Sequence, residues 1–455
     1  MVSSNYLDAI DKYTNENRAR FEDMLGAIVQ IPTVSMDPER KQDIRKGASL
    51  AVEYLRSLGA EAEVCETSGN PVVVGRFLVA NARRTVTIYN HLDVQPAEEP
   101  EWTREPFLFV KADGRYLGRG TTDDKGPALT ALLGARYAVE NGVPLNIQFV
   151  WELEEEIGSP HFEQFMKAHH KRLKPDSVLV SDTMWVARDR PAIPYGLRGM
   201  ITGVMTLETH QKDTHSGVTG GGARNPLAEL ALLISQLHDA KTGRVKIPGF
   251  YDDVMPVSKK EMEGFLASGF DLKKWKQVYG FKSLRTNDVR DLLQRLWCLP
   301  TFEVHGILGG YTGPGVKTVV PPRGELKFST RLVPRQKPEK ILRLLKGYVR
   351  KLNPDVKILK EATLDPYLGS LKGRYVEAAS DALVYGFNKK PVFIREGGSI
   401  GAVVTMEKYW KVPIIFIGLS LPEHGYHAPN ENYDWAQASG GIKVFANYFA
   451  QISKL

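Results

Sequence analysis

The sequence predicts an α/β fold in which a mostly parallel sheet sandwiched by helices is interrupted by a smaller α+β domain. Three observations lead to this prediction. Short apolar runs rich in Val and Ile recur along the chain, and four of them are followed by acidic or histidine residues. Segments of helical periodicity lie between these runs. A central stretch has a different residue pattern, in which apolar and polar residues alternate, and this change indicates an insertion.

The four runs have the composition of strands buried on both faces of a sheet. They span residues 85–90, 146–151, 177–181 and 412–418 and contain hardly any charge. Such runs are typical of parallel sheets. Because ligands of an open α/β sheet bind outside the carboxyl ends of its strands, we expect the polar residues after the four runs to converge on one point.

Helices and the inserted domain complete the expected order. Residues 126–142 carry apolar side chains at helical spacing. Stretches 199–209 and 325–333 alternate like half-exposed strands, and helical stretches follow them at 226–239 and 338–352. The first pattern, short apolar runs with helical segments between them, then returns and ends in a C-terminal helix. The expected domain limits are 1–198 and 366–455 for the main domain, and 199–365 for the insertion.

Composition argues against several classes of protein. The 455 residues have a net charge of +7 without a block of like charge, so we expect no nucleic-acid partner. Only two cysteines occur, Cys65 and Cys298, too few for a disulfide framework or a multi-cysteine zinc site. No apolar run has the length of a membrane span, and the first residues do not resemble a secretory signal. We therefore expect a cytoplasmic protein with no membrane partner.

Clusters of carboxylates and histidines form the ligand inventory of a site for two divalent metals. His91 and Asp93 share one face of the first strand, so that Asp93 is able to accept the second ring N–H of a metal-bound His91. Taken alone, each cluster is explained as well or better by a polar loop, a helix cap or a solvated surface. Their joint placement at one sheet edge favours a metal site. The other clusters are Asp123 with Asp124, Glu154 to Glu156, Asp182 and His427.

Nine segments resemble, in this order, the dinuclear-zinc metallopeptidases that include carnosinase, cytosolic nonspecific dipeptidase, peptidase V, aminoacylase and acetylornithine deacetylase. The resemblance spans nearly the whole chain and is closest to the dipeptidase branch. It implies a catalytic domain interrupted by a lid and dimerisation domain. The segments are HLDVQPA (91–97), GRGTTDDKGP (118–127), EEIGS (155–159), SDTMW (181–185), YGLRG (195–199), DTHSGV (213–218), GPGVKTVVPP (313–322), EGGSI (396–400) and HAPNE (427–431).

The resemblance implies a set of metal ligands. His91 and Asp182 would bind one ion, Glu156 and His427 the other, and Asp123 would bridge both. Zinc is the expected metal, and manganese or cobalt could replace it because carboxylate-rich sites discriminate poorly among divalent ions.

Two further roles near the metals also follow from the resemblance. Asp93 would orient His91, and Glu155 would be the general base. A third glutamate, Glu154, leaves the register of base and ligand open by one position. We favour Glu155 as the base because EEIGS then aligns with the family pattern Glu-Glu-x-Gly-Ser.

Substrate contacts are implied in the insertion and beyond it. His215 would reach the active site of the other subunit of a homodimer and stabilise the oxyanion. Arg331 would hold the terminal carboxylate of a small peptide substrate, with Ser399 and the backbone of Gly398 nearby. An arginine is suited to this role because it grips a carboxylate with two parallel hydrogen bonds.

The expected activity is metal-dependent hydrolysis of the amide bond of dipeptides or short peptides with a free C-terminal carboxylate. An N-acyl-amino-acid deacylase and a carboxypeptidase are the alternatives with the same machinery. A catalytically silent binding protein is the alternative of another class, and the presence of every ligand and of the base argues against it. The stretch 265–285 shows no interpretable motif.

Overall fold

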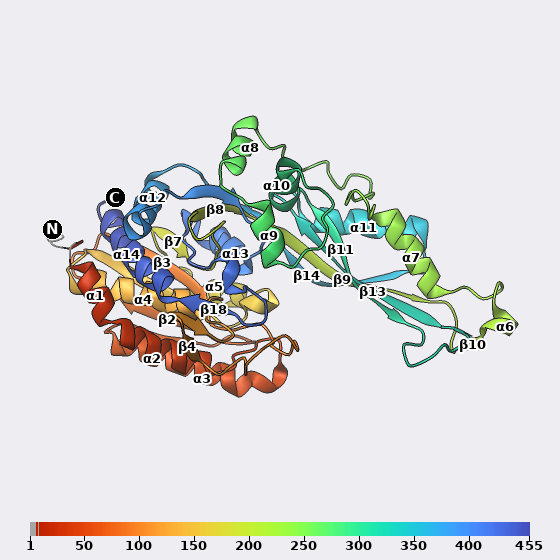
Figure 1. The fold of residues 1–455 in the computed structure, drawn as a ribbon, viewed down its shortest axis with the longest axis horizontal. Coiled ribbons are helices and arrows are strands. Elements are labelled where there is room, and N and C mark those ends of the chain that lie inside the picture. Colours follow the sequence, from red (N-terminus) through yellow and green to blue (C-terminus); the bar gives the residue numbers. More distant parts are fainter. Residues whose placement is uncertain (1–5, 8) are drawn as a thin grey trace.

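A six-stranded sheet forms the centre of a rounded body, from which a narrow arm extends (Figure 1). The computed structural model describes residues 6, 7 and 9–455. The strand order in the central sheet is β1 (Glu61–Cys65), β2 (Val72–Phe77), β6 (Leu145–Glu152), β3 (Arg84–His91), β7 (Ser177–Val180) and β17 (Ile414–Phe416).

The four predicted strands correspond to β3, β6, β7 and β17, which run parallel to one another. β2 pairs antiparallel with β6, and β1 pairs antiparallel with β2. All of β7 and most of β3 are buried, which explains why these runs contain hardly any charge. The α/β prediction is confirmed, and the carboxyl ends of the four parallel strands share one edge of the sheet.

Helices cover the sheet and enclose two apolar cores. The helix α4 is buried along most of its length, and Gly134 allows α14 to approach it, since a Cβ there would lie 2.7 Å from Cβ of Phe445. The first core involves α1 (Ile10–Glu16), α2 (Arg18–Val29), α3 (Lys41–Ser57), α4 (Lys125–Glu140), α12 (Arg374–Phe387) and α14 (Trp435–Ile452). The second involves α5 (Phe162–His169) and α13 (Gly401–Trp410).

Short elements complete the body. The chain leaves the body after β8 (Ala192–Leu197) and returns at β15 (Tyr367–Leu368), and the domain limits expected at residues 198/199 and 365/366 stay a prediction. One small sheet contains β4 (Val110–Ala112), β5 (Arg115–Leu117) and β18 (Asn432–Asp434), and another contains β8 (Ala192–Leu197), β15 (Tyr367–Leu368) and β16 (Val392–Arg395). Three 3-10 helices are η1 (Pro38–Arg40), η2 (Glu155–Ile157) and η3 (Pro422–His424).

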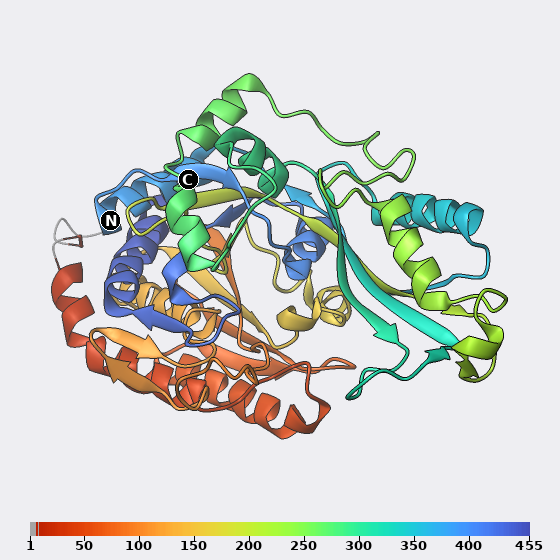
Figure 2. The ribbon, with the colours of Figure 1, turned by 45° about the vertical axis from the view of Figure 1, so that its right-hand side comes forward.

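The arm is built on an antiparallel sheet with a core of its own. Its strand order is β11 (Thr301–Gly309), β13 (Arg323–Leu332), β9 (Gly199–Glu208) and β14 (Lys357–Leu364). The helices α7 (Pro226–Leu237) and α11 (Pro338–Leu352) contribute to this core. At the tip, β10 (Thr214–His215) pairs with β12 (Val319–Val320) beside α6 (Ser216–Thr219), far from the body in both ribbon views (Figures 1 and 2).

Three helices of the insertion lie beside the body instead of the arm sheet. They are α8 (Lys259–Leu266), α9 (Leu272–Val278) and α10 (Val289–Trp297). Phe265 and Trp297 share a small apolar core with Ala192 of β8 and Ile394 of β16, and α9 contacts η3. The insertion is thus divided between an arm and a group of helices next to the carboxyl edge of the central sheet.

Within residues 6, 7 and 9–455, no helix combines the length and apolar character needed to cross a membrane.

Candidate metal centre

The predicted metal ligands lie at the carboxyl edge of the central sheet. His91 is the last residue of β3, Glu156 follows β6, Asp182 follows β7, and His427 lies in the loop after β17. Asp123 comes shortly before α4, and its peptide bond to the next residue is cis. Because the four strands are parallel, they bring these side chains together from distant parts of the chain.

The first group of candidate ligands consists of His91, Asp123 and Asp182. Nε2 of His91 lies 2.9 Å from Oδ1 of Asp123 and 3.8 Å from Oδ2 of Asp182. All three residues are buried, and one donor atom from each lies within 4.8 Å of the others. The hydroxyl of Tyr426 donates to Asp182 and thereby orients its carboxylate.

The second group consists of Asp123, Glu156 and His427. Nε2 of His427 lies 2.8 Å from Oδ2 of Asp123 and 3.2 Å from Oε2 of Glu156. Gln95 donates to the same glutamate oxygen at 2.6 Å. Asp123 therefore presents one carboxylate oxygen to each histidine, which is the geometry expected of a bridging ligand.

The charges of these residues fit a pair of divalent cations. Burial opposes protonation of the histidines, but the carboxylates raise the pKa of His91 and raise that of His427 to about 11. Burial also opposes ionisation of Asp123, yet hydrogen bonds from the two histidines hold its pKa below its ordinary value. Cations between these donors would replace the ring protons. Imidazole nitrogens and carboxylate oxygens are donors that zinc and related ions accept.

Asp93 contacts more than the ring that it was expected to orient. Nδ1 of His91 lies 3.0 Å from the backbone carbonyl oxygen of Asp93 and 3.5 Å from its Oδ1. The carboxylate accepts the backbone N–H groups of Glu155 and Glu156 at 3.2 and 3.0 Å. Asp93 thus connects the end of β3 to the glutamate turn, because its backbone carbonyl contacts the ring of His91 and its buried carboxylate holds the two glutamates.

The three consecutive glutamates have three different environments. Glu154 accepts the backbone N–H groups of Asn70 and His161 and belongs to neither group of candidate ligands. Glu156 joins the second ligand group. Glu155 lines the adjacent cavity, and burial raises its pKa well above the ordinary value although the charge of His91 opposes this shift. A carboxylate with a raised pKa beside metal ligands is suited to accept and release a proton.

Glu431 is a positioning residue that the sequence analysis did not single out. It is fully buried and accepts the backbone N–H groups of Gly120, Thr122 and Asp123 at 2.9 to 3.0 Å. Arg119 donates to the same carboxylate at 3.0 Å. This side chain therefore holds the loop that presents Asp123. Its place in HAPNE, four residues after His427, was the available signal.

A cavity of about 500 Å³ adjoins the metal ligands. Glu155, Asp182 and His427 line one side of it. Arg331 of β13 also lines it and donates to Oγ of Ser399 at 2.9 Å, and Gly398 lies in the same wall. The predicted base, metal ligands and carboxylate-binding residues thus border one space of the size that a dipeptide needs.

Aromatic residues from the uninterpreted stretch 265–285 form another wall of this cavity. They are Phe270, Trp275, Tyr279 and Phe281, from α9 and its flanks, and Trp297 of α10 lies beside them. Glu396 also lines the cavity; burial and the charge of Asp182 raise its pKa to about 8. No sequence period indicated the aromatic wall, because its members take their places through the packing of α8 and α10 on the body.

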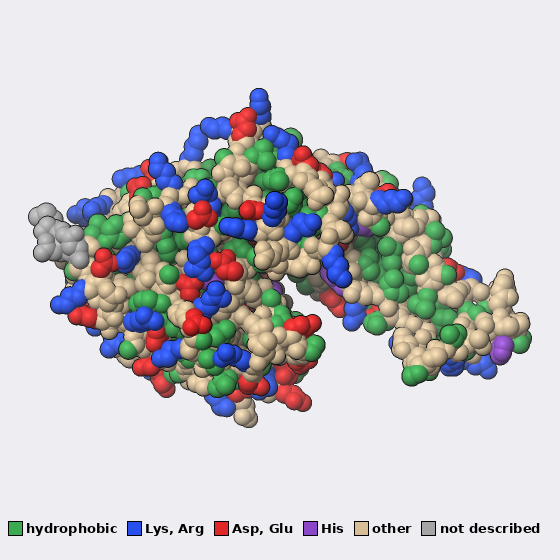
Figure 3. Space-filling model, in the orientation of Figure 1, with side chains coloured by type: hydrophobic (Ala, Val, Ile, Leu, Met, Phe, Trp, Pro, Cys, Tyr) green, Lys and Arg blue, Asp and Glu red, His purple; other side chains and the backbone are tan. Residues whose placement is uncertain are grey.

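His215 does not lie at this cavity in a single protomer. It is exposed at the tip of the arm, where Nδ1 of its ring accepts the N–H of Gly217. Figure 3 shows the surface deeply hollowed between the body and the arm. The predicted oxyanion donor is therefore remote from the metal ligands of its own chain.

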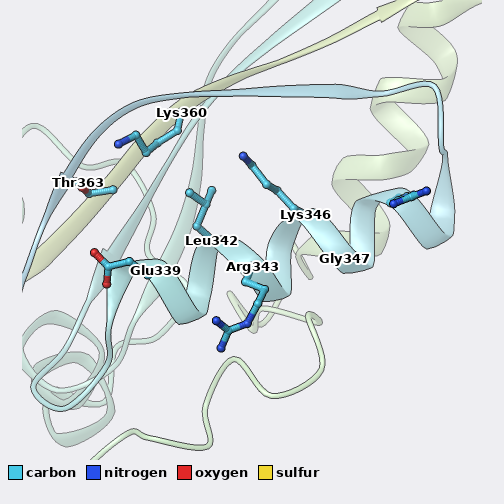
Figure 4. Close-up of a pocket in the computed structure, with 8 residues that line it drawn as sticks. Glu339, Leu342, Arg343, Lys346, Gly347, Lys360 and Thr363 are labelled. Atoms are coloured by element: carbon cyan, nitrogen blue, oxygen red, sulfur yellow. The ribbon is translucent and has the colours of Figure 1, made fainter.

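A second cavity, of about 520 Å³, lies between α11 and β14 on the arm. Figure 4 shows Leu342 and Lys346 on the side of the helix that faces Lys360 and Thr363. Four of its eight lining residues are basic, Glu339 is the acidic one among the eight, and no histidine contributes. These residues do not include a set of metal ligands like that at the carboxyl edge of the central sheet.

Comparison with known proteins extends over the whole chain. The sequence model of Peptidase family M20/M25/M40 matches residues 87–451 of this chain. Human Beta-Ala-His dipeptidase is 29% identical over 99% of this chain and 93% of its own, and the Cys-Gly metallodipeptidase dug1 of Schizosaccharomyces pombe is 31% identical over 99% of each. The structure of human carnosine dipeptidase 1 covers 100% of both chains with a TM-score of 0.89 and 28% identity. The metallo-carboxypeptidase Sso-CP2 of Sulfolobus solfataricus has a TM-score of 0.88 and 32% identity, with 95% of this chain and 98% of its own covered.

Proposed function

The chain belongs to peptidase family M20/M25/M40 and is a metal-dependent dipeptidase, and we propose that it cleaves short peptides with a free C-terminal carboxylate, using Glu155 as general base. The observation that carries this proposal is the pair of ligand groups sharing Asp123, with Glu155 and Arg331 lining one adjacent cavity. A water and a peptide carbonyl would meet between these residues.

The proposed site holds two divalent cations, which we infer to be zinc. His91 and Asp182 would bind one, Glu156 and His427 the other, and Asp123 both. When bound, such a pair lowers the pKa of a water and polarises the scissile carbonyl. Manganese or cobalt would fit the same donors.

The protein's own residues perform the proton transfers in this proposal. Glu155 takes the proton of the attacking water and passes it to the departing amine. Burial raises the pKa of Glu155, which supports this role because a carboxylate with a raised pKa takes up a proton more readily than an ordinary one. Asp93 keeps Glu155 in place through the backbone N–H of that residue.

Arg331 and Ser399 are proposed to bind the substrate's terminal carboxylate. Arg331 is already held by Oγ of Ser399, and burial lowers its pKa, which indicates a partly desolvated guanidinium. A carboxylate placed there would gain charge-assisted hydrogen bonds. This contact supports selection of peptides with a free C-terminus.

We also propose a homodimer in which His215 acts on the partner's substrate. The exposed edge strand β11 supports this assembly, because it presents Val304, Ile307 and Leu308 to solvent with 36 to 51% of their surface exposed. Leu232 of the neighbouring α7 is 58% exposed. Unpaired edges with apolar side chains are surfaces on which a second strand pairs.

The cytoplasmic location expected from the sequence stays a prediction. Cys65 and Cys298 are free and buried. Free thiols persist in a reducing compartment, which is compatible with this prediction.

The proposed function is tested by chelation combined with a substrate screen. Exhaustive treatment with a chelator should abolish hydrolysis of dipeptides, and zinc, manganese or cobalt should restore it. The screen compares dipeptides with tripeptides, N-acetyl amino acids and dipeptide amides. Full activity after verified metal removal would contradict the metal site, and a preference for N-acetyl amino acids would contradict the dipeptidase assignment.

A further inference from the structure

The aromatic wall of the cavity is a feature that core packing does not explain. The wall comprises Phe270, Trp275, Tyr279 and Phe281, whose rings are neighbours: the Trp275 centroid lies 5.8 Å from that of Phe270, 5.6 Å from that of Tyr279 and 4.9 Å from that of Phe281. None of the residues of α9 is buried, and Tyr279 and Phe281 expose 48% and 41% of their surface. Exposed aromatic clusters of this kind usually mark a binding surface.

The wall borders the same cavity as the candidate catalytic residues. Glu155, Asp182 and His427 line this space together with the four aromatic residues, and Arg331 lines it as well. A dipeptide whose carboxylate contacts Arg331 and whose carbonyl lies near the metal ligands has one remaining part, its N-terminal residue. That residue must occupy space bordered by the rest of the cavity lining.

Charge indicates which end of the peptide faces the wall. Glu396 and Asp182 line the cavity, and Oε2 of Glu396 is buried without a hydrogen-bond partner among the described residues. Glu396 lies near Tyr279 of the wall, since burial raises the pKa of Tyr279 and the charge of Glu396 raises it further. The substrate's α-amine can donate a hydrogen bond to the unpartnered Oε2 of Glu396, whereas the carboxylate end is attracted to Arg331. The amine end, with its side chain, therefore lies beside the aromatic wall.

We propose that the aromatic wall is the pocket for the side chain of the substrate's N-terminal residue and that it selects aromatic and large aliphatic side chains. This inference rests on the proposed function, since it assigns the substrate class of the same site. The rings bury apolar side chains favourably. Trp275 contributes most to the apolar surface of the pocket in this proposal, because the three other rings of the wall are its neighbours.

The test is the selectivity of variants toward dipeptides that share a C-terminal glycine. The specificity constant kcat/KM is measured for Phe-Gly, Leu-Gly and Gly-Gly with the metal-loaded dimer. Trp275→Ala is expected to lower the ratio of Phe-Gly to Gly-Gly by about 10- to 100-fold, since filling an apolar pocket discriminates by such factors. Tyr279→Ala should act in the same direction. Trp275→Phe should retain most of the ratio.

Lys273→Ala is the matched control, because Lys273 is an exposed residue of the same helix that does not line the cavity. Its ratio should equal that of the wild type. A ratio changed by less than about threefold in both Trp275→Ala and Tyr279→Ala, with intact folding and metal content, would overturn the proposal. Gly-Phe and Gly-Leu are measured as a second series, and a loss of kcat/KM confined to that series would also overturn the proposal, because it would assign the wall to the C-terminal residue.

Failure of the proposed function gives a different result. In that case, the metal-loaded wild type hydrolyses no dipeptide of either series, and no selectivity ratio exists. Failure of the aromatic-wall proposal instead leaves an active dipeptidase whose preferences do not respond to the wall.

Discussion

The body and the arm hold their functional residues in opposite ways. In the body, the candidate ligands follow buried parallel strands and are held by further side chains, as Glu431 holds the Asp123 loop and Tyr426 holds Asp182. In the arm, His215 is exposed on a two-residue strand at the tip. All five candidate metal ligands therefore come from one chain, whereas the proposed oxyanion donor depends on how two chains assemble.

The largest expected effect concerns the division of labour between neighbouring glutamates in the body. Glu155→Ala should bind two metal ions but lower kcat by about 10²- to 10⁴-fold, because it removes the proton acceptor. Glu156→Ala should lose metal, because it removes a ligand. Both are checked by elemental analysis and by turnover of a dipeptide. Glu154→Gln is the control, and it should resemble the wild type in both measurements. If Glu155→Ala instead lost metal, while Glu156→Ala kept metal and lost turnover, the assignment of base and ligand would be wrong by one position.

The arm should contribute to catalysis only through a partner. His215→Ala should keep its metals and lower kcat by about 10²- to 10³-fold, the value typical of one oxyanion donor. Mixed with Glu155→Ala protomers, it should recover about a quarter of wild-type activity, since half of the dimers are heterodimers with one intact site. The mixture is assayed after subunit exchange is verified by mass spectrometry. Inactive heterodimers would show that each chain uses its own residues.

A smaller effect is expected where the arm meets the body, at Arg331. Arg331→Ala should raise KM and lower kcat/KM by about 10- to 100-fold for dipeptides, because charge-assisted hydrogen bonds to the terminal carboxylate are lost. The same variant should hardly alter hydrolysis of dipeptide amides, which lack that carboxylate. Steady-state kinetics on both substrates provide the comparison. Equal losses on acid and amide would assign Arg331 a structural role instead.

The contrast between body and arm also explains which features the sequence could predict. The four parallel strands were predictable because burial on both faces leaves short, uncharged runs of Val and Ile. Four of the five candidate ligands were expected from their positions after these runs, and Asp123 was expected from the resemblance of its motif. In both cases local composition carries the information, because the parallel sheet itself determines where each strand end lies.

Features that depend on packing between distant segments were not predictable. The contact of Asp93 with two backbone N–H groups depends on the exact turn after β6. The aromatic wall depends on how Phe265 of α8 and Trp297 of α10 pack on β8 and β16. Neither produces a period or a motif, because the partners are brought together only by the folded chain.

The smallest expected effect is a pH dependence beneath the metal site. Burial raises the pKa of Glu152 to about 8, and Tyr89 donates to its Oε2 at 2.8 Å. The folded state therefore binds a proton that the unfolded state releases near the ordinary value of 4.5, so stability falls as the pH rises between these two values. Glu152→Gln removes this titration and keeps a neutral acceptor for Tyr89. Its stability relative to the wild type should accordingly increase with pH, by about 1 to 3 kcal/mol in total.

Thermal unfolding of chelated protein at pH 5 and pH 8.5 measures this difference. The exposed substitution Glu53→Gln, on α3, should give the same small change at both pH values and serves as the control. A Glu152→Gln effect that does not vary with pH would mean that Glu152 is ionised in the folded protein. Glu152 pairs with His91 at the carboxyl edge of the central sheet. That result would therefore also indicate that this edge tolerates more negative charge than burial alone allows.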